Sequence, residues 1–417
     1  MQTPDLRALR SICSEPYGFW LDSAIAYRDA GAASYCGAEP LAMLTSRGRC
    51  IRVEHRRGAT ERFEADPFDV LRSLLAEHSR LRDGMAVGYL GYGLKRHIEA
   101  LTDTVADDLQ LPECYLSFYD RVHEFDPRPL YSHAHMVTAP GPGAALQSNI
   151  SRESYESAIE RALAYIRAGD IYQVNLSHRF QAACAEDPFD VYLRLRTQSP
   201  APFGAFLRYP GFAVLSSSPE RFLYYRPADR LVETRPIKGT RPRGSDAASD
   251  RALARDLVRS EKDRAENVMI VDLVRNDLGR VTDIGSVHVT GLLELETFAN
   301  VHHLVSTVQA RLRPDRDIVD LLRAAFPAGS ITGAPKIRAM EIIDELEPLA
   351  RGVYTGAIGF IRPSGAMDLN VAIRTMLLKD GIASFSVGGG IVADSDPSLE
   401  YEETLHKGAG MARALSG

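Results

Sequence analysis

Apolar residues recur at helical spacing in several parts of the chain. The clearest apolar stripe consists of Tyr155, Ile159, Leu163 and Ile166. Ser151 can cap the start of this helix and Gly169 can end it. Similar patterns predict helices over residues 249–278, 317–326 and 335–346, and a last helix from Pro397 with Asp396 as its N-cap.

Other segments alternate between apolar and polar residues, which is typical of strands. In residues 171–180, Tyr172, Val174 and Leu176 alternate with Gln173, Asn175 and Ser177. The polar side of this strand either meets solvent or lines a cavity. Residues 211–225 and 230–240 read as two further strands, and residues 355–392 as consecutive antiparallel strands joined by glycine-containing turns. Because strands come in clusters with helices between the clusters, we expect an α+β (mixed α/β) fold with antiparallel or mixed sheets.

A boundary is predicted at residues 138–149, TAPGPGAALQSN. This stretch is rich in Pro, Gly and Ala and has no periodicity, so it is typical of a linker. It divides the chain into an N-terminal region, residues 1–140, and a larger region, residues 150–412.

Composition narrows the class of protein. The net charge of -6 gives no reason to expect binding to nucleic acid or to a membrane surface, and no run of 18 apolar residues predicts a membrane-spanning helix. The N-terminus lacks a signal-peptide pattern. Five scattered cysteines without metal-site spacing indicate reduced thiols, so we expect a cytoplasmic protein.

Two predicted helices each carry a pair of carboxylates on one face. Asp263 and Glu266 are three residues apart, as are Glu400 and Glu403, with Lys407 one turn further on. Mg²⁺ takes few protein carboxylates and keeps waters and substrate oxygens, so two helices that each offer a Glu suit it. A solvated acidic face is the alternative interpretation.

Basic and glycine-rich stretches suggest a site for an anion. Lys238 lies in PIKGTRPR, which lacks the frame of a nucleotide-binding loop, and a plain basic loop is the alternative. A buried Arg374 in VAIRTM would need an anionic partner, and with Tyr354 it would suit a ligand carboxylate. Gly388 to Gly390 favour close approach of the backbone to a ligand.

Eight separate motifs together resemble the chorismate-utilising enzymes, the family of anthranilate, aminodeoxychorismate, isochorismate and salicylate synthases. The motifs are SPERF, PIKGTRPR, KDRAENVMIVDLVRND, HHLVS, GSITGAPK, VAIRT, GGGIVADS and EYEET, within residues 150–412. Residues 1–140 resemble the family only loosely. The resemblance implies two large antiparallel sheets packed face to face as a sandwich, with helices outside and the active site between the sheets.

The resemblance also implies roles for residues. Glu266 and Glu403 would hold a Mg²⁺ ion that binds the ring carboxylate of chorismate, with Asp263 and Glu400 behind them. Glu220 would be the general acid that protonates the departing 4-hydroxyl group. Further substrate contacts would come from Gly239, Thr240, His303 and Ser330 around the ring and from Tyr354, Arg374, Gly388 and Gly390 at the enolpyruvyl carboxylate.

Two positions distinguish branches of the family. Lys238 resembles the aminodeoxychorismate synthases, whereas the other branches usually carry alanine there; the lysine amine would form a covalent adduct that ammonia then displaces. Gln173 stands where isochorismate and salicylate synthases carry a lysine base, so water is disfavoured as the nucleophile.

The resemblance implies partners and leaves alternatives open. None of the five cysteines lies in a G-x-C-x-G motif, so a separate glutamine amidotransferase subunit would supply ammonia, and a separate aminodeoxychorismate lyase would act on the product. Anthranilate synthase component I remains an alternative. PAPFGAFL at residues 200–207 resembles the segment lining the family's tryptophan pocket, so a bound structural or inhibitory tryptophan is an open interpretation. A non-catalytic binding protein with this fold is the other alternative.

Overall fold

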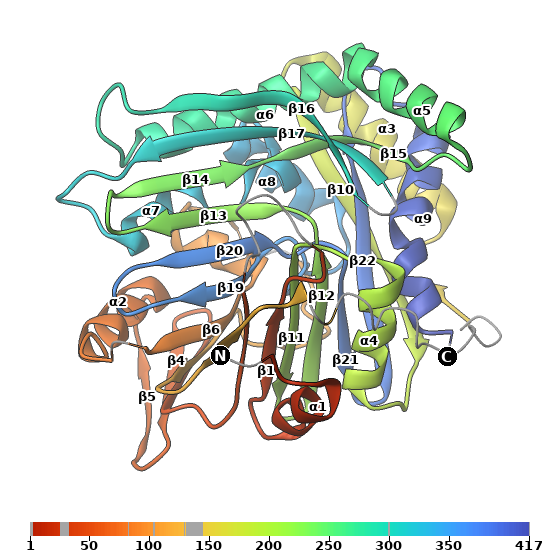
Figure 1. The fold of residues 1–417 in the computed structure, drawn as a ribbon. Helices are drawn as coiled ribbons and strands as arrows, with labels where there is room; N and C mark the ends of the chain where they lie inside the picture. The colour runs from red at the N-terminus through yellow and green to blue at the C-terminus, as the bar shows by residue number, and fades with distance from the viewer. Residues whose placement is uncertain are drawn as a thin grey trace.

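The architecture consists of two large antiparallel sheets with helices on their outer sides (Figure 1). The structure is a computed structural model that describes residues 3–25, 33–81, 83–102, 105–128, 130, 145–298 and 301–416. Most of the predicted linker, residues 138–144, lies outside the described residues. Within the described part of the chain, no helix is long and apolar enough to cross a membrane.

The first sheet, sheet A, contains ten described strands. Its order is β18 (Gly333–Ala334), β10 (Gln173–Ala183), β22 (Ile382–Ile391), β21 (Thr375–Lys379), β12 (Phe212–Ser218), β11 (Phe203–Tyr209), β1 (Phe19–Asp22), β2 (Ser34–Gly37) and β8 (His123–Phe125), with β9 (Gln147–Ser148) paired to β10.

The second sheet, sheet B, contains twelve described strands. Its order is β15 (Ile237–Pro242), β17 (Val301–Arg311), β14 (Leu231–Arg235), β13 (Arg221–Arg226), β20 (Met367–Val371), β19 (Ala357–Ile361), β6 (Met85–Leu90), β7 (Cys114–Tyr119), β3 (Ala42–Arg47), β4 (Cys50–His55) and β5 (Thr60–Glu64), with β16 (His288–Thr297) on the other side of β17.

Helices cover the outer sides of both sheets (Figure 1). Helix α9 packs on β22 and against α3 and α4, whereas α6 packs on β17 and β15. The helices are α1 (Leu6–Ser14), α2 (Pro67–Glu77), α3 (Arg152–Ala168), α4 (Pro188–Gln198), α5 (Ala247–Arg259), α6 (Glu261–Gly279), α7 (Ile318–Ala325), α8 (Lys336–Leu346) and α9 (Pro397–Ala414), with short 3-10 helices at η1 (Tyr92–His97) and η3 (Gly329–Ile331).

Strands from both sides of the predicted boundary enter both sheets. Sheet A takes β1, β2 and β8 from the N-terminal region, and sheet B takes β3 to β7. A shared core between the sheets includes Tyr115 of β7 and Tyr209 of β11, whose rings stack with centroids 4.1 Å apart. The boundary at residues 138–149 therefore does not separate two sheets or two cores, and Gln147–Ser148 within it is strand β9.

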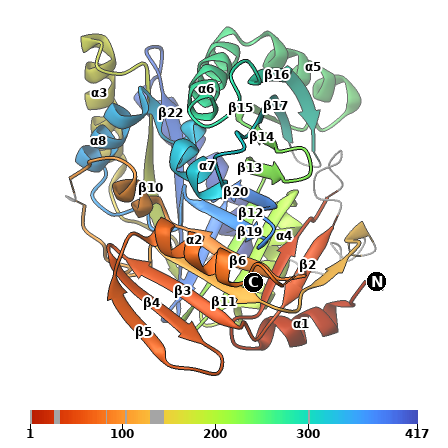
Figure 2. The same cartoon turned by 90° about the vertical axis from the view of Figure 1, so that its left-hand side faces the viewer.

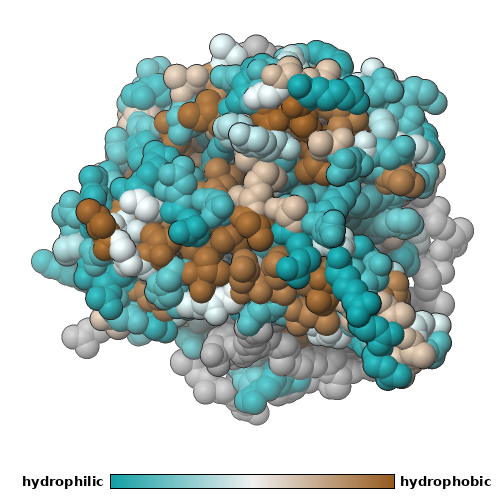
Figure 3. All heavy atoms as spheres, turned by 90° about the horizontal axis from the view of Figure 1, so that it is seen from above, coloured by the Kyte–Doolittle hydropathy of each residue, from teal (hydrophilic) through white to brown (hydrophobic). Residues whose placement is uncertain are grey.

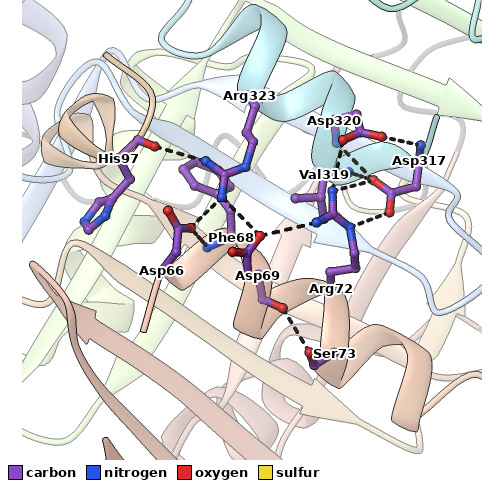
Figure 4. Close-up of polar contacts among 10 residues, drawn as sticks. All are labelled: Asp66, Phe68, Asp69, Arg72, Ser73, His97, Asp317, Val319, Asp320 and Arg323. Carbon is purple, nitrogen blue, oxygen red and sulfur yellow. Dashed lines mark hydrogen bonds and ion pairs between the residues drawn. The ribbon is translucent and has the colours of Figure 1, made fainter. Parts of the chain in front are cut away.

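An ion-pair network also ties the N-terminal region to the rest (Figure 4). Arg72 of α2 contacts Asp317 at 2.6 Å and Asp320 at 3.0 Å, where α7 begins. Arg323 of α7 returns to Asp66 at 2.7 Å. Figure 2 shows α2 and α7 stacked beside one another on this side of the molecule.

Several predicted elements are confirmed at their ends. Helix α3 is capped by the Ser151 side chain, and Gly169 ends it with a φ of +82°. Helices α7 and α8 match their predicted spans closely, and Asp396 caps α9 through two backbone N–H groups.

Other predictions are wrong, because a single predicted helix or strand is divided into two in the structure. The helix predicted over residues 249–278 is two helices, because Ser260 leaves helical geometry and caps α6 by accepting from the N–H of Asp263. The two strands predicted at 211–225 and 230–240 are four, β12 to β15. Each pair divides where the chain passes Pro219 or Pro236, and proline cannot donate to a strand ladder.

One face of the molecule exposes apolar side chains. Figure 3 views the molecule from above, onto the side where α5, α6 and β16 lie in Figure 1, and shows brown atoms running across its middle. The exposed large apolar residues on these elements are Val258, Val268, Leu292 and Leu295.

Candidate active site

Lys238 is held at the end of sheet B by an irregular strand. Strand β15 pairs with β17 with a register shift between Ile237 and Thr240, and Gly239 between them has a φ of +84°. A Cβ placed on Gly239 would lie 2.9 Å from the Cβ of Asp263, so the turn needs glycine. The result is a Lys238 side chain that is only 11% exposed, with its Nζ 3.9 Å from Oε2 of Glu266.

Burial favours the neutral form of this lysine. It lowers the pKa of Lys238, and the positive charge of Lys407 acts in the same direction. The carboxylates of Glu266, Glu220 and Glu403 oppose this shift. A neutral amine within reach of carboxyl groups is a competent nucleophile.

Glu220 lies between β12 and β13 and is buried. Burial raises its pKa to about 7, while the Ser330 hydroxyl, the charge of Lys238 and the backbone N–H of Ile237 act against the rise. A carboxyl group with this pKa keeps a proton at neutral pH for a substantial fraction of the time. It therefore suits the predicted role of general acid.

The two acidic helices face the lysine. On α6, burial raises the pKa of Glu266, and Lys238 and Lys262 oppose the rise. On α9, Lys407 lowers the pKa of Glu403 through a 2.7 Å ion pair.

The two remaining predicted carboxylates are held by protein groups. Asp263 pairs with Arg241 at 3.1 Å. Glu400 is buried between Lys262 at 3.0 Å and the Ser395 hydroxyl at 2.6 Å. Both are thus tied into fixed positions beside Glu266 and Glu403.

The donor set fits a Mg²⁺ ion that shares its coordination with a substrate. The described residues contain no group of three or more His, Cys, Asp or Glu side chains arranged to hold a metal by themselves. Glu266 and Glu403 offer two carboxylates, and the raised pKa of Glu266 shows that its buried charge lacks full compensation. Mg²⁺ commonly uses one or two protein carboxylates and completes its shell with water and substrate oxygens.

Strand β22 of sheet A forms another wall of the site, beside α9. Gly390 of β22 pairs with Asn175 of β10, and a Cβ on Gly390 would lie 2.3 Å from Nε2 of Gln173 and 3.2 Å from Nζ of Lys238. Oε1 of Gln173 and Oδ1 of Asn175 are buried without a hydrogen-bond partner in the described structure. The polar side of β10 is therefore buried rather than in contact with solvent, and its predicted place in a ligand cavity stays a prediction.

Gly388 lies on the same stretch of β22. The pairing of β22 with β21 ends at Phe385, so around Gly388 the described strand neighbour is β10. Lys407 donates to the Gly388 carbonyl at 3.0 Å. The predicted use of glycine N–H groups toward a carboxylate stays a prediction.

A neutral histidine and a half-buried arginine complete the site. Burial, helped by the charge of Arg374, lowers the pKa of His303 to about 3, and the Thr240 hydroxyl lies 2.8 Å from its Nδ1. Burial also lowers the pKa of Arg374 to about 10. Among the described residues no ion pair involves Arg374, as expected of a guanidinium that receives an anion from a ligand.

Tyr354 precedes β19 and is buried. The guanidinium of Arg351 lies 5.9 Å from its ring centroid, and Arg351 is fixed by Glu347 at 2.6 Å. Its predicted contact with a ligand carboxylate stays a prediction.

Sequence reasoning placed Lys407 on one face with Glu400 and Glu403, but it missed two other cations that hold acidic groups, Lys262 and Arg351. Lys262 lies four residues before Glu266, so helical spacing signals it. Arg351, which also donates to the Asn175 carbonyl at 2.6 Å, has only the weaker signal of Glu347 four residues earlier.

A second hollow of about 930 Å³ lies away from Lys238, between the sheets. Phe203 and Gly204 of the PAPFGAFL segment line it, together with Leu21 and Asn370. Chemistry at Lys238 does not involve this hollow, and tryptophan binding there stays an open prediction.

Comparisons with known proteins place this site in a family. Residues 37–413 match the family model described as chorismate binding enzyme. Aminodeoxychorismate synthase component 1 of Salmonella typhimurium is 42% identical, with 94% of this chain and 91% of the relative covered. Anthranilate synthase component 1 of Acetivibrio thermocellus is 37% identical, with 92% and 86% covered.

A solved structure supports the architecture. Anthranilate synthase component I from Streptococcus pneumoniae matches with a TM-score of 0.80 at 33% identity and covers 93% of each chain. The predicted fold of two large antiparallel sheets with helices outside is confirmed.

Proposed function

Since the chain belongs to the family of chorismate binding enzymes, we propose that it is an aminodeoxychorismate synthase component 1. It would convert chorismate and ammonia to 4-amino-4-deoxychorismate for the synthesis of 4-aminobenzoate. The observation that carries the proposal is the buried Lys238, whose lowered pKa and position beside Glu266 and Glu220 suit a nucleophile. Relatives of that name are between 36% and 42% identical to this chain.

The proposed reaction has two displacements. The neutral amine of Lys238 bonds to C2 of chorismate, the ring double bond shifts, and the 4-hydroxyl leaves with the proton of Glu220 as water. Ammonia then bonds to C4, the double bond shifts back, and the Lys238 amine leaves neutral. Displacement at opposite ends of the allylic system explains why the new amine is at C4.

The other residues bind and orient the substrate. Arg374 faces the enolpyruvyl carboxylate, and neutral His303 with Thr240 borders the ring. Glu266 and Glu403 would hold Mg²⁺, which when bound neutralises the ring carboxylate and the charge that develops on it. Gln173 cannot act as a base, which disfavours water as the nucleophile.

Ammonia would come from a partner. The component 1 names of the relatives imply a second component, and we propose a glutamine amidotransferase subunit for this role. A separate aminodeoxychorismate lyase would release pyruvate from the product. A cytoplasmic location is part of the same proposal.

Mass spectrometry with chorismate, Mg²⁺ and ammonium tests the proposal. We expect an amino-for-hydroxyl product that added lyase converts to 4-aminobenzoate, and its loss by at least a thousandfold in Lys238→Ala. Anthranilate and pyruvate as products would instead make the chain an anthranilate synthase component 1, the function named for its 37–38% identical relatives. No consumption of chorismate would favour a binding protein.

A further inference from the structure

A small cavity lies behind Glu220, on the side away from the lysine site. Its polar lining consists of Glu220, Arg221, Thr234, Asp277 and Ser330, and Val274 and Leu278 contribute apolar walls. Its water-accessible volume is about 20 Å³. One water needs at least roughly 10–15 Å³ and two to four polar partners, so the cavity has the size and the lining for a single water.

The far wall of this cavity leads toward solvent through an ion pair. Asp277 of α6 is 6% exposed, and its Oδ2 lies 2.5 Å from Nζ of Lys336 at the start of α8. Lys336 also donates to the Ala325 carbonyl and has a side chain that is 12% exposed. Asp277 and Lys336 thus form a hydrogen-bonded pair that runs from the wall of the cavity toward the edge of the molecule.

The proposed reaction gives such a connection a use, because Glu220 loses a proton in every turnover. The product amine keeps its proton at neutral pH, as aliphatic amines do. Glu220 therefore regains its proton from solvent before the next cycle. The substrate side of Glu220 is filled by reactants, whereas the cavity side is not.

We infer that one water in this cavity links Glu220 to Asp277 and Lys336, and that Asp277 is a positioning residue that returns a proton to Glu220. The Glu220 carboxylate takes a proton from the water, and the water takes one from Asp277. Asp277 takes its proton from the Lys336 ammonium, and solvent reprotonates the amine, so one proton moves inward per cycle. The direction of transfer rests on the proposed function; the hydrogen-bonded link does not.

The charged groups around this route are few. Lys238 and the N–H of Ile237 face Glu220 from β15, and Ser330 faces it from η3. Lys336 faces Asp277 from α8, with Arg280 just after α6 and Glu99 acting at longer range. Arg221 of β13 also lines the cavity and is paired with Asp368 at 2.7 Å. Burial raises the pKa of Asp277, and Lys336 opposes this most strongly.

The test measures the pKa of Glu220 without turnover, from the infrared band of its protonated carboxyl group in wild-type protein minus Glu220→Gln. Val274→Ile adds one methylene to the cavity wall, and we expect it to exclude the water and raise the pKa of Glu220 by about one unit. Asp277→Asn leaves the Lys336 charge unpaired, and we expect it to lower this pKa by a similar amount. Ala325→Val is a second filling variant if Val274→Ile does not fold.

Asp344→Asn is the matched control. Asp344 lies on α8, the helix that also carries Lys336. It forms a 2.6 Å ion pair with the buried Lys95 but does not line the cavity. We expect a loss of thermal stability with no change in the pKa of Glu220. If Val274→Ile and Asp277→Asn behave like this control, the cavity is dry, the Asp277–Lys336 pair only stabilises the fold, and the inference is wrong.

Steady-state kinetics of the same variants provide an independent test. We expect kcat to fall at least fivefold in Val274→Ile and Asp277→Asn with KM for chorismate unchanged. A wild-type protein that consumes no chorismate would contradict the proposed function, but the infrared shifts would still test the link. Shifts in pKa without any fall in kcat would overturn the relay.

Discussion

At the scale of single residues, Glu220 couples catalysis to stability. Its ordinary pKa of 4.5 applies in the unfolded chain, and burial raises the value to about 7 in the folded protein. Below pH 4.5 both states hold the proton. As pH rises to 7 the unfolded state releases its proton first, so the folded state loses stability across this window, by up to about 3 kcal/mol.

Glu220→Gln removes this titration. We therefore expect the variant to gain stability over wild type between pH 5 and pH 8, by about 2 kcal/mol or more, although it loses activity. Urea unfolding at the two pH values measures the difference. An equal difference at both pH values would mean that Glu220 titrates normally in the folded protein.

Gly390 is a second single residue whose substitution tests the site. A Cβ there would lie 2.3 Å from Nε2 of Gln173 and 3.2 Å from Nζ of Lys238, so the added methyl group would displace the Gln173 side chain and crowd the lysine amine. We expect Gly390→Ala to lower kcat/KM at least tenfold with little change in melting temperature. Gly279→Ala is the control, because nothing lies within 4 Å of a Cβ at Gly279. A fully active Gly390→Ala variant would mean that the amine of Lys238 does not react beside this wall of the site.

At the scale of elements, α6 and α9 meet through the charges of their carboxylates and lysines. A Mg²⁺ ion held by Glu266 and Glu403 would bind the folded state alone, so we expect added Mg²⁺ with chorismate to raise the melting temperature by several degrees. Glu403→Gln should abolish the Mg²⁺-dependent part of this rise. Glu402→Gln, whose exposed carboxyl pairs with Arg152, should retain it.

The ends of helices were easier to predict from the sequence than whether a predicted helix or strand is unbroken. Ser151, Gly169 and Asp396 carry local cap chemistry, and the structure uses each as predicted. The break at Ser260 was missed because serine occurs inside helices as well as at their caps. That break sets the start of α6, and it places Asp263 and Glu266 beside β15.

At the scale of the whole molecule, the two regions of the sequence form one folding unit. Without residues 1–140, sheet A would lose β1, β2 and β8, and Tyr209 and its neighbours between the sheets would face water. We expect a fragment of residues 145–417 to lack a cooperative thermal transition, while the full chain has one. Cooperative unfolding of the fragment, measured by calorimetry, would contradict this view.

The sequence by itself determined the helix caps, the class of fold and which residues are candidates for the chemistry, because caps, periodicity and motifs depend on residues close together in the chain. Only the tertiary structure decided the pKa values of those residues and the geometry around them. The pKa values of Lys238, Glu220 and His303 depend on burial and on charges brought from distant segments. The bulge at Gly239 and the cavity behind Glu220 likewise arise from contacts between strands and helices that no local pattern records.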